Sequence, residues 1–236
     1  ATPDRCRPGR CGTARSQGAE GIPVADAVLD GRAVRFGVPA VMGTYEGVLN
    51  EDGTGITGRW MQGGADLALS LERVAEAPKI LRPQEPPASQ SRYRTEQVTY
   101  QNLGAGITLG GSLTVPNGEW PFPAVLLISG SGPQDRNETT FGHKPFLVLS
   151  DHLTKQGIAV LRVDDRGVGA SQGDLRQSTS ADLAEDVRVG IALLKSRPEI
   201  DPKRIGLVGH SEGGIIAPMV AAESPDVAFI VLLAPP

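Results

Sequence analysis

The segment LVGHSEGGI, residues 207–215, places a serine between two glycines directly after an apolar run. A serine hydroxyl attacks a carbonyl carbon when a base accepts its proton and when the side chain stands clear of the backbone. A sharp strand-to-helix turn provides that exposure, and glycines on either side leave room where side chains would collide. We therefore predict that Ser211 is a nucleophile. The alternative is an ordinary turn with a capping serine. The predicted elbow around it consists of Gly209, His210 and Gly213.

A tetrahedral intermediate on a serine needs backbone amides that point at its oxyanion. One expected donor is the N–H of Glu212, the residue after the nucleophile. The second donor is expected in LLISGSGPQDRN, where Gly130, Ser131 and Gly132 follow a buried strand. Ser131 is the first choice and Gly132 the second. The alternative for this segment is a glycine-rich turn without a catalytic role.

The elements that would position these residues alternate between strand and helix from about residue 93. Buried strands are predicted in PAVLLISG, IAVLRV, RIGLVG and VAFIVLL, and EQVTYQ and ITLGGSLTV are predicted to form a strand pair. Helices are predicted in KPFLVLSDHLTKQG, TSADLAEDVRVGIALLKSR and GGIIAPMVAAE; Thr179 and Asp182 have the spacing of a capping box. This alternation predicts an α/β fold with a doubly wound, mainly parallel sheet covered by helices.

The rest of the chain divides by composition. We predict a disordered, Arg-rich leader over 1–19 and a small antiparallel β domain over 20–74, where Asp-Gly pairs favour hairpins. The alternation of DLALSLERV predicts a strand with one buried face, which carries Leu67, Leu69 and Leu71. Residues 75–92 contain four prolines and are predicted to form a linker to the α/β domain at 93–236.

Composition excludes some partners. The net charge of −4 gives no electrostatic reason to expect nucleic acid, and no apolar stretch is long enough to span a bilayer. Cys6 and Cys11 could form a local disulfide in an exported protein, but a disordered leader is the favoured interpretation. The N-terminus does not reveal the location, although an exported or periplasmic one is favoured over the cytoplasm.

The segment RVDDRGVGASQGD carries two adjacent acids, Asp164 and Asp165, beside Arg166. They could be acid catalysts or a metal site. Adjacent residues on an extended strand point to opposite faces, so these two carboxylates are not expected to converge on one substrate. A structural role for this loop is the favoured interpretation.

In this order and spacing, SGSGPQDRN, DDRGVGAS and GHSEGG resemble the bacterial α/β-hydrolase esterases, in the group near serine aminopeptidase-like and dienelactone-hydrolase-like proteins. The resemblance covers about residues 93–236, and the region before it is similar to the small β domain that precedes many such hydrolases. It implies hydrolysis of small-molecule carboxylic esters by a Ser, Asp or Glu, and His triad, without a metal or an organic cofactor.

The sequence departs from this family in its triad. In α/β-hydrolases the chain order is Ser, acid, His, but beyond the elbow residue Glu212 this sequence has only Glu223 and Asp226 as acids and no histidine. His210 is expected to point into the packing around its strand, His152 to lie on a helix, and His143 to border the catalytic face. We therefore expect the hydrolase domain to be incomplete after strand six, with the acid and the histidine on later loops.

Three functions remain open on the sequence alone. The leading one is a serine esterase. An aminopeptidase-like or acyl-peptide hydrolase would have the same elbow, because acyl transfer to serine serves amides and esters alike. The third is a non-catalytic protein that binds a ligand or partner on a hydrolase scaffold.

Overall fold

A computed structural model describes residues 11–14, 19–75, 92–140 and 142–236. The chain forms two compact units, Ala1–Leu81 and Arg82–Pro236. The predicted linker at 75–92 lies almost entirely outside the described residues, as does Cys6. No helix in the described ranges has the length and apolar character that crossing a membrane requires.

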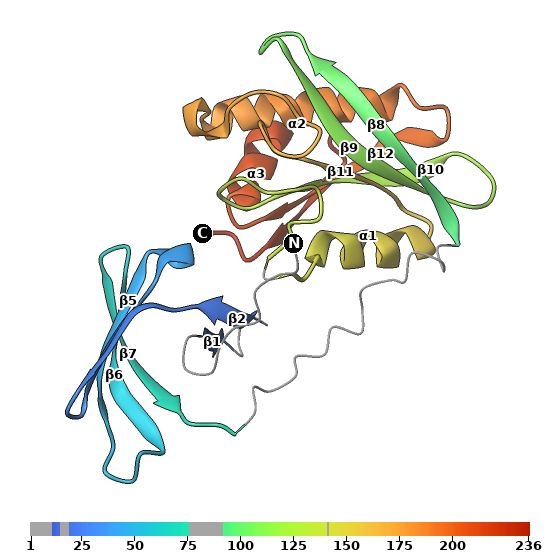
Figure 1. The fold of residues 1–236 in the computed structure, drawn as a ribbon. Helices are drawn as coiled ribbons and strands as arrows, with labels where there is room; N and C mark the ends of the chain where they lie inside the picture. The colour runs from blue at the N-terminus through green and yellow to red at the C-terminus, as the bar shows by residue number, and fades with distance from the viewer. Residues whose placement is uncertain (1–10, 15–18, 76–91, 141) are drawn as a thin grey trace. The chain divides into compact units, whose positions relative to one another are not determined.

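The first unit is built from antiparallel strands (Figure 1). Five of them form a sheet in sequence order: β3 (Ala25–Asp30), β4 (Ala33–Val38), β5 (Gly43–Leu49), β6 (Gly55–Gln62) and β7 (Ala65–Glu72). Gly31 and Gly53 have φ of 58° and 70° in the turns where Asp-Gly pairs predicted hairpins, so these two predictions are confirmed.

Strand β1 (Cys11–Ala14), inside the range of the predicted leader, pairs antiparallel with β2 (Ala19–Pro23). One expectation for this unit differs from the structure. The DLALSLERV segment does form strand β7, but Leu67 and Leu69 are 58% and 39% exposed. An alternating pattern buries one face of a strand only where another layer covers that face, and the pattern by itself does not supply such a layer.

The second unit contains a six-stranded mixed sheet in the order β13-β12-β10-β11-β9-β8. Strands β10, β11, β12 and β13 are parallel, whereas β9 runs antiparallel to β11 and β8 antiparallel to β9. The strands are β8 (Tyr93–Asn102), β9 (Ile107–Pro116), β10 (Phe122–Ile128), β11 (Ala159–Val163), β12 (Ile200–His210) and β13 (Phe229–Leu233). The predicted α/β class and mainly parallel sheet are therefore observed.

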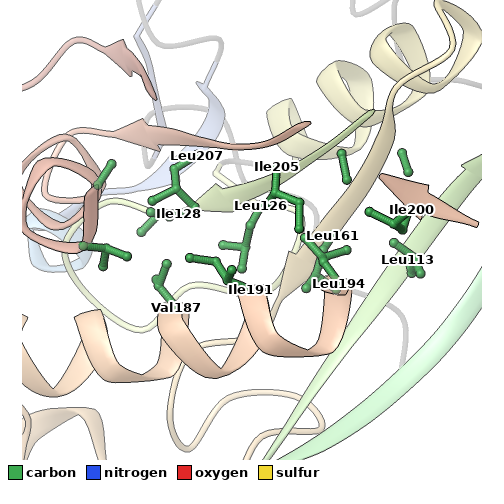
Figure 2. Close-up of a cluster of buried hydrophobic side chains, with 14 of the residues drawn as sticks. Leu113, Leu126, Ile128, Leu161, Val187, Ile191, Leu194, Ile200, Ile205 and Leu207 are labelled. Carbon is green, nitrogen blue, oxygen red and sulfur yellow. The ribbon is translucent and has the colours of Figure 1, made fainter. Parts of the chain in front are cut away.

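Helices cover both faces of this sheet (Figure 1). Helix α1 (Pro145–Lys155) packs on one face, where Phe146 joins the cluster of Val125, Leu127, Val160 and Val208. Helices α2 (Ser180–Lys195) and α3 (Gly213–Glu223) pack on the other. Figure 2 shows Val187, Ile191 and Leu194 of α2 facing side chains of the sheet. Thr179 and Asp182 form the predicted capping box at the start of α2.

The sheet brings three loops to one edge. Strands β10, β11 and β12 are parallel neighbours, so the segments after Ile128, Val163 and His210 emerge together at their carboxyl ends. Strand β13 lies at the edge of the described sheet, and its side chains from Phe229 to Leu232 are 36–43% exposed. The loops at the carboxyl ends are where the predicted site residues lie.

Candidate active site

Ser211 occupies the turn between β12 and α3 with a φ of 49°, in the left-handed region that side-chain-bearing residues rarely adopt. Its N–H donates to the carbonyl of Leu233 at 3.0 Å, and its carbonyl accepts from the N–H of Gly214 at 2.8 Å. Such a conformation costs about 1–3 kcal/mol and persists only where the surroundings impose it. This strained strand–turn–helix geometry is that of a nucleophile elbow.

The two flanking glycines are required by close backbone approach, as the sequence predicted. A Cβ on Gly209 would lie 2.0 Å from the carbonyl oxygen of Gly213. A Cβ on Gly213 would lie 2.3 Å from the carbonyl oxygen of Ile128, at the end of β10. The backbone of the elbow is therefore in close contact with the end of β10, the strand that precedes the predicted oxyanion loop.

The predicted oxyanion loop follows β10 and passes beside the nucleophile. A Cβ on Gly130 would lie 3.1 Å from the Cβ of Ser211. The Gly130 amide is already engaged, because it donates to Glu138 Oε1 at 2.8 Å. The amides of Ser131 and Glu212, by contrast, donate to no acceptor in the described part of the chain. This pattern leaves those two predicted donors available to a bound oxyanion.

Gly132, the second choice as donor, has a φ of 90° and no neighbour within 4 Å of the position a Cβ would take. A valine there would meet no clash, but its side chain strongly disfavours this φ, so the loop would change conformation. We expect Gly132→Val to lower kcat for an ester substrate by about 100-fold, the cost of losing one oxyanion donor, with little change in KM. Steady-state kinetics would check this, and a raised KM at unchanged kcat would contradict a role of this loop in the transition state.

Asp164 and Asp165, for which the sequence predicted a structural role, hold the oxyanion loop through hydrogen bonds and an ion pair. Asp164 binds the side chain of Arg136 at 2.5 Å and the Arg136 backbone N–H at 2.8 Å. Asp165 accepts from Ser129 Oγ at 2.7 Å and from the backbone N–H of Gln134 at 2.9 Å. The two carboxylates thus fix both ends of the loop instead of converging on a substrate.

The environments of these two acids differ. Burial alone would raise the pKa of Asp164, but hydrogen bonds from Arg136 and the backbone of Ala170 outweigh it and lower that pKa. Burial raises the pKa of Asp165 to about 6, in spite of the hydrogen bonds that it accepts and with a contribution from the nearby charge of Glu138. The Asp165 carboxylate is therefore ionised mainly above pH 6, and it accepts the hydrogen bonds from the loop as an anion there.

The expectation for His210 was wrong. Its side chain is 41% exposed and its Nδ1 lies 2.7 Å from Glu138 Oε1, so the ring is not buried in the packing around β12. His152 lies on helix α1, as predicted, and is exposed. His143 pairs through its backbone with Thr140. Neither His152 nor His210 makes a hydrogen bond to the Ser211 side chain within the residues that the structure describes.

The two acids beyond the elbow, Glu223 and Asp226, lie at or just after the far end of α3, as expected. Glu223 forms an ion pair with Arg188, and Asp226 lies 2.6 Å from Lys195. Neither is engaged with the elbow.

Sequence reasoning missed Glu138 and Arg136, which contact the site's loops. The signal was present in the polar run PQDRNE directly after the glycine-rich turn, because charged residues that follow such a turn can hold it by side-chain hydrogen bonds. Their partners could not be identified from the sequence because these lie 28 and 72 residues further along the chain.

A pocket of about 630 Å³ adjoins the elbow and the oxyanion loop. Gly130, Gly132 and Glu212 line it on one side, and apolar side chains including Val163, Val187 and Ile216 line it elsewhere. Its size falls within the range of small-molecule sites.

The sheet order, the turn after β12 and the glycine-rich loop after β10 are features of the α/β-hydrolase fold. Residues 145–236 match the family described as serine aminopeptidase, S33. The crystal structure of the α/β hydrolase GrgF from Penicillium sp. sh18 superposes with a TM-score of 0.52 at 28% identity, covering 60% of this chain and 46% of GrgF. The second unit thus has the α/β-hydrolase fold.

Two curated relatives are esterases by name. Esterase EstD of Thermotoga maritima is 34% identical over 128 residues, which cover 54% of this chain and 30% of EstD. Esterase FrsA of Yersinia enterocolitica is 32% identical over 153 residues, which cover 63% of this chain and 34% of FrsA. The chain thus spans about a third of the length of these relatives.

Proposed function

We propose that this protein is a serine hydrolase of small-molecule carboxylic esters, which acts through an acyl-enzyme on Ser211. The observation that carries the proposal is the strained conformation of Ser211 beside two amides, those of Ser131 and Glu212, that donate to no described acceptor. An unsatisfied pair of donors next to a serine at a positive φ suits a tetrahedral oxyanion. The likeness to two proteins named esterases supports the substrate class.

In the proposed reaction the Ser211 hydroxyl attacks the ester carbonyl, and its proton passes to a base. The carbonyl oxygen becomes an oxyanion, which the Ser131 and Glu212 amides would stabilise. Collapse of the intermediate expels the alcohol and leaves an acyl group on Ser211, which water then removes. Among the described residues, neither His152 nor His210 forms a hydrogen bond with the Ser211 hydroxyl, so the structure does not identify the base.

Cleavage of amino-terminal peptide bonds is the second candidate, and one observation favours it: residues 145–236 match a family described as serine aminopeptidase. The same elbow would serve, since an amide and an ester pass through the same tetrahedral intermediate. The non-catalytic alternative is the less favoured, because a binding role requires neither the strain at Ser211 nor the free amides beside it.

Matched substrates that release a coloured product separate the two reactions. We expect the full-length protein to hydrolyse p-nitrophenyl propionate and to leave alanine p-nitroanilide essentially intact. Because esters are intrinsically more reactive than anilides, ester turnover alone does not decide. A kcat/KM for the anilide within about tenfold of that for the ester would favour the aminopeptidase, since every tenfold step corresponds to about 1.4 kcal/mol of transition-state stabilisation. Turnover of neither would support a binding protein.

A further inference from the structure

Resting on the proposed function, we propose that Glu138 is a positioning residue, whose carboxylate sets the distance between the oxyanion loop and the nucleophile. One oxygen of Glu138 joins the two parts of the site. It accepts the Gly130 N–H at 2.8 Å and lies 2.7 Å from His210 Nδ1. Gly130 immediately precedes the proposed donor Ser131, and His210 immediately precedes Ser211. A single atom therefore connects the neighbours of both reacting partners.

The local geometry makes this connection tight. The position that a Cβ of Gly130 would take is 3.1 Å from the Ser211 Cβ, 3.3 Å from the Glu138 carboxylate and 3.3 Å from His210 Nδ1. All three side chains thus converge on one backbone position. Any movement of the Glu138 carboxylate would shift Gly130, and with it the amide of Ser131.

Glu138 also has an unfavourable backbone conformation and a buried carboxylate. Its φ is 53°, a conformation that glycine or asparagine would adopt more readily, and it is 5% exposed. Its carboxylate is buried near that of Asp165, which adds repulsion. A strained residue with a buried charge persists where surrounding contacts over-determine it, and such residues cluster at functional sites.

The contact with Glu138 also suits one role for His210. An ionised carboxylate only accepts hydrogen bonds, so beside an ionised Glu138 the Nδ1 of His210 is the donor. The ring then acts as a donor that secures Glu138, and the roles of the three groups follow in order: His210 holds Glu138, Glu138 holds Gly130, and Gly130 orients Ser131.

Two substitutions at position 138 give a graded test in the full-length protein with p-nitrophenyl propionate. Glu138→Gln keeps a neutral acceptor in the same place, so we expect kcat to fall about threefold to tenfold. Glu138→Leu removes both bonds, and we expect kcat to fall about 30- to 100-fold with KM nearly unchanged, because a small misplacement of a catalytic group has costs of this size. Glu119→Gln, at an exposed glutamate of the same unit, is the matched control and should match the wild type.

Position 210 provides a rescue that a merely structural role would not show. The side-chain amide of asparagine can donate to Glu138 as the Nδ1–H does, so His210→Asn should stay within about threefold of the wild-type kcat. His210→Leu should lose about tenfold, as expected for one lost hydrogen bond to a charged group. Thermal unfolding and labelling of Ser211 by a fluorophosphonate, measured on each variant, separate loss of folded protein from loss of reactivity.

Two results would overturn the proposal. One is a folded Glu138→Leu variant whose kcat is within threefold of the wild type, or higher, as expected if the negative charge of Glu138 merely repelled the oxyanion. The other is a loss confined to KM. Failure of the proposed function is distinguishable from both, because the wild-type protein itself would then show no turnover that depends on Ser211.

Discussion

Ser211→Ala is expected to lower ester turnover of the full-length protein by about 10³-fold or more while the fold stays intact, because the members of a catalytic triad act as a unit. Removing the hydroxyl removes the atom that attacks the carbonyl carbon. Alanine relieves nothing in the backbone, since it has the same steric limits at a φ of 49° that serine has. Initial rates with p-nitrophenyl propionate, together with thermal unfolding curves, would measure both effects.

The matched control for this variant is Ser196→Ala, at an exposed serine beyond the end of α2. Its hydroxyl bonds only to the Leu193 carbonyl among the described residues, at the end of α2 and outside both the elbow and the oxyanion loop. We expect it to retain wild-type turnover. Retention of most activity by a folded Ser211→Ala variant would disprove the assignment of the nucleophile and leave the free amides of the loop without an explanation.

Local signals predicted most of the second unit. The capping box of α2 depends on Thr179 and Asp182, three residues apart, and the face of α2 that packs on the sheet follows from helical periodicity. The elbow was predictable for a similar reason: the collision between Gly209 and Gly213 involves residues four apart. Interactions of short range in sequence leave a pattern in the sequence.

The contacts that connect the loops of the site leave no such pattern. Glu138 and His210 are 72 residues apart, and the prediction that His210 points into the core failed because nothing near it in sequence indicates a carboxylate partner. The structural role of Asp164 and Asp165 was foreseen from the alternation of side chains along a strand. Their partners, Arg136, Ser129 and Gln134, became visible only when the sheet order placed β10 beside β11.

Gly209→Ala is expected to lower both the stability and the turnover of the protein, and it tests the elbow without changing any polar group. The new methyl group would lie 2.0 Å from the carbonyl oxygen of Gly213 and 2.3 Å from its carbonyl carbon. Both are backbone atoms in the first turn of α3, so the collision cannot be relieved by rotating a side chain. We expect the free energy of unfolding to fall by about 1–3 kcal/mol, as for other overpacked sites, and kcat to fall by about 100-fold as Ser211 is displaced.

Gly104→Ala is the matched control, since a Cβ there would lie 3.4 Å from the Asn102 side chain, an ordinary contact, at an exposed position of the same unit. Denaturant unfolding and steady-state kinetics on both variants distinguish the two effects. If Gly209→Ala lowered stability but left kcat unchanged, α3 would have moved as a whole and Ser211 would tolerate displacement. The strained backbone conformation of Ser211 would then not be needed for catalysis. A fall in kcat in protein that remains folded is the result that ties the backbone geometry of the elbow to the chemistry, because the substitution alters neither the hydroxyl of Ser211 nor the oxyanion loop.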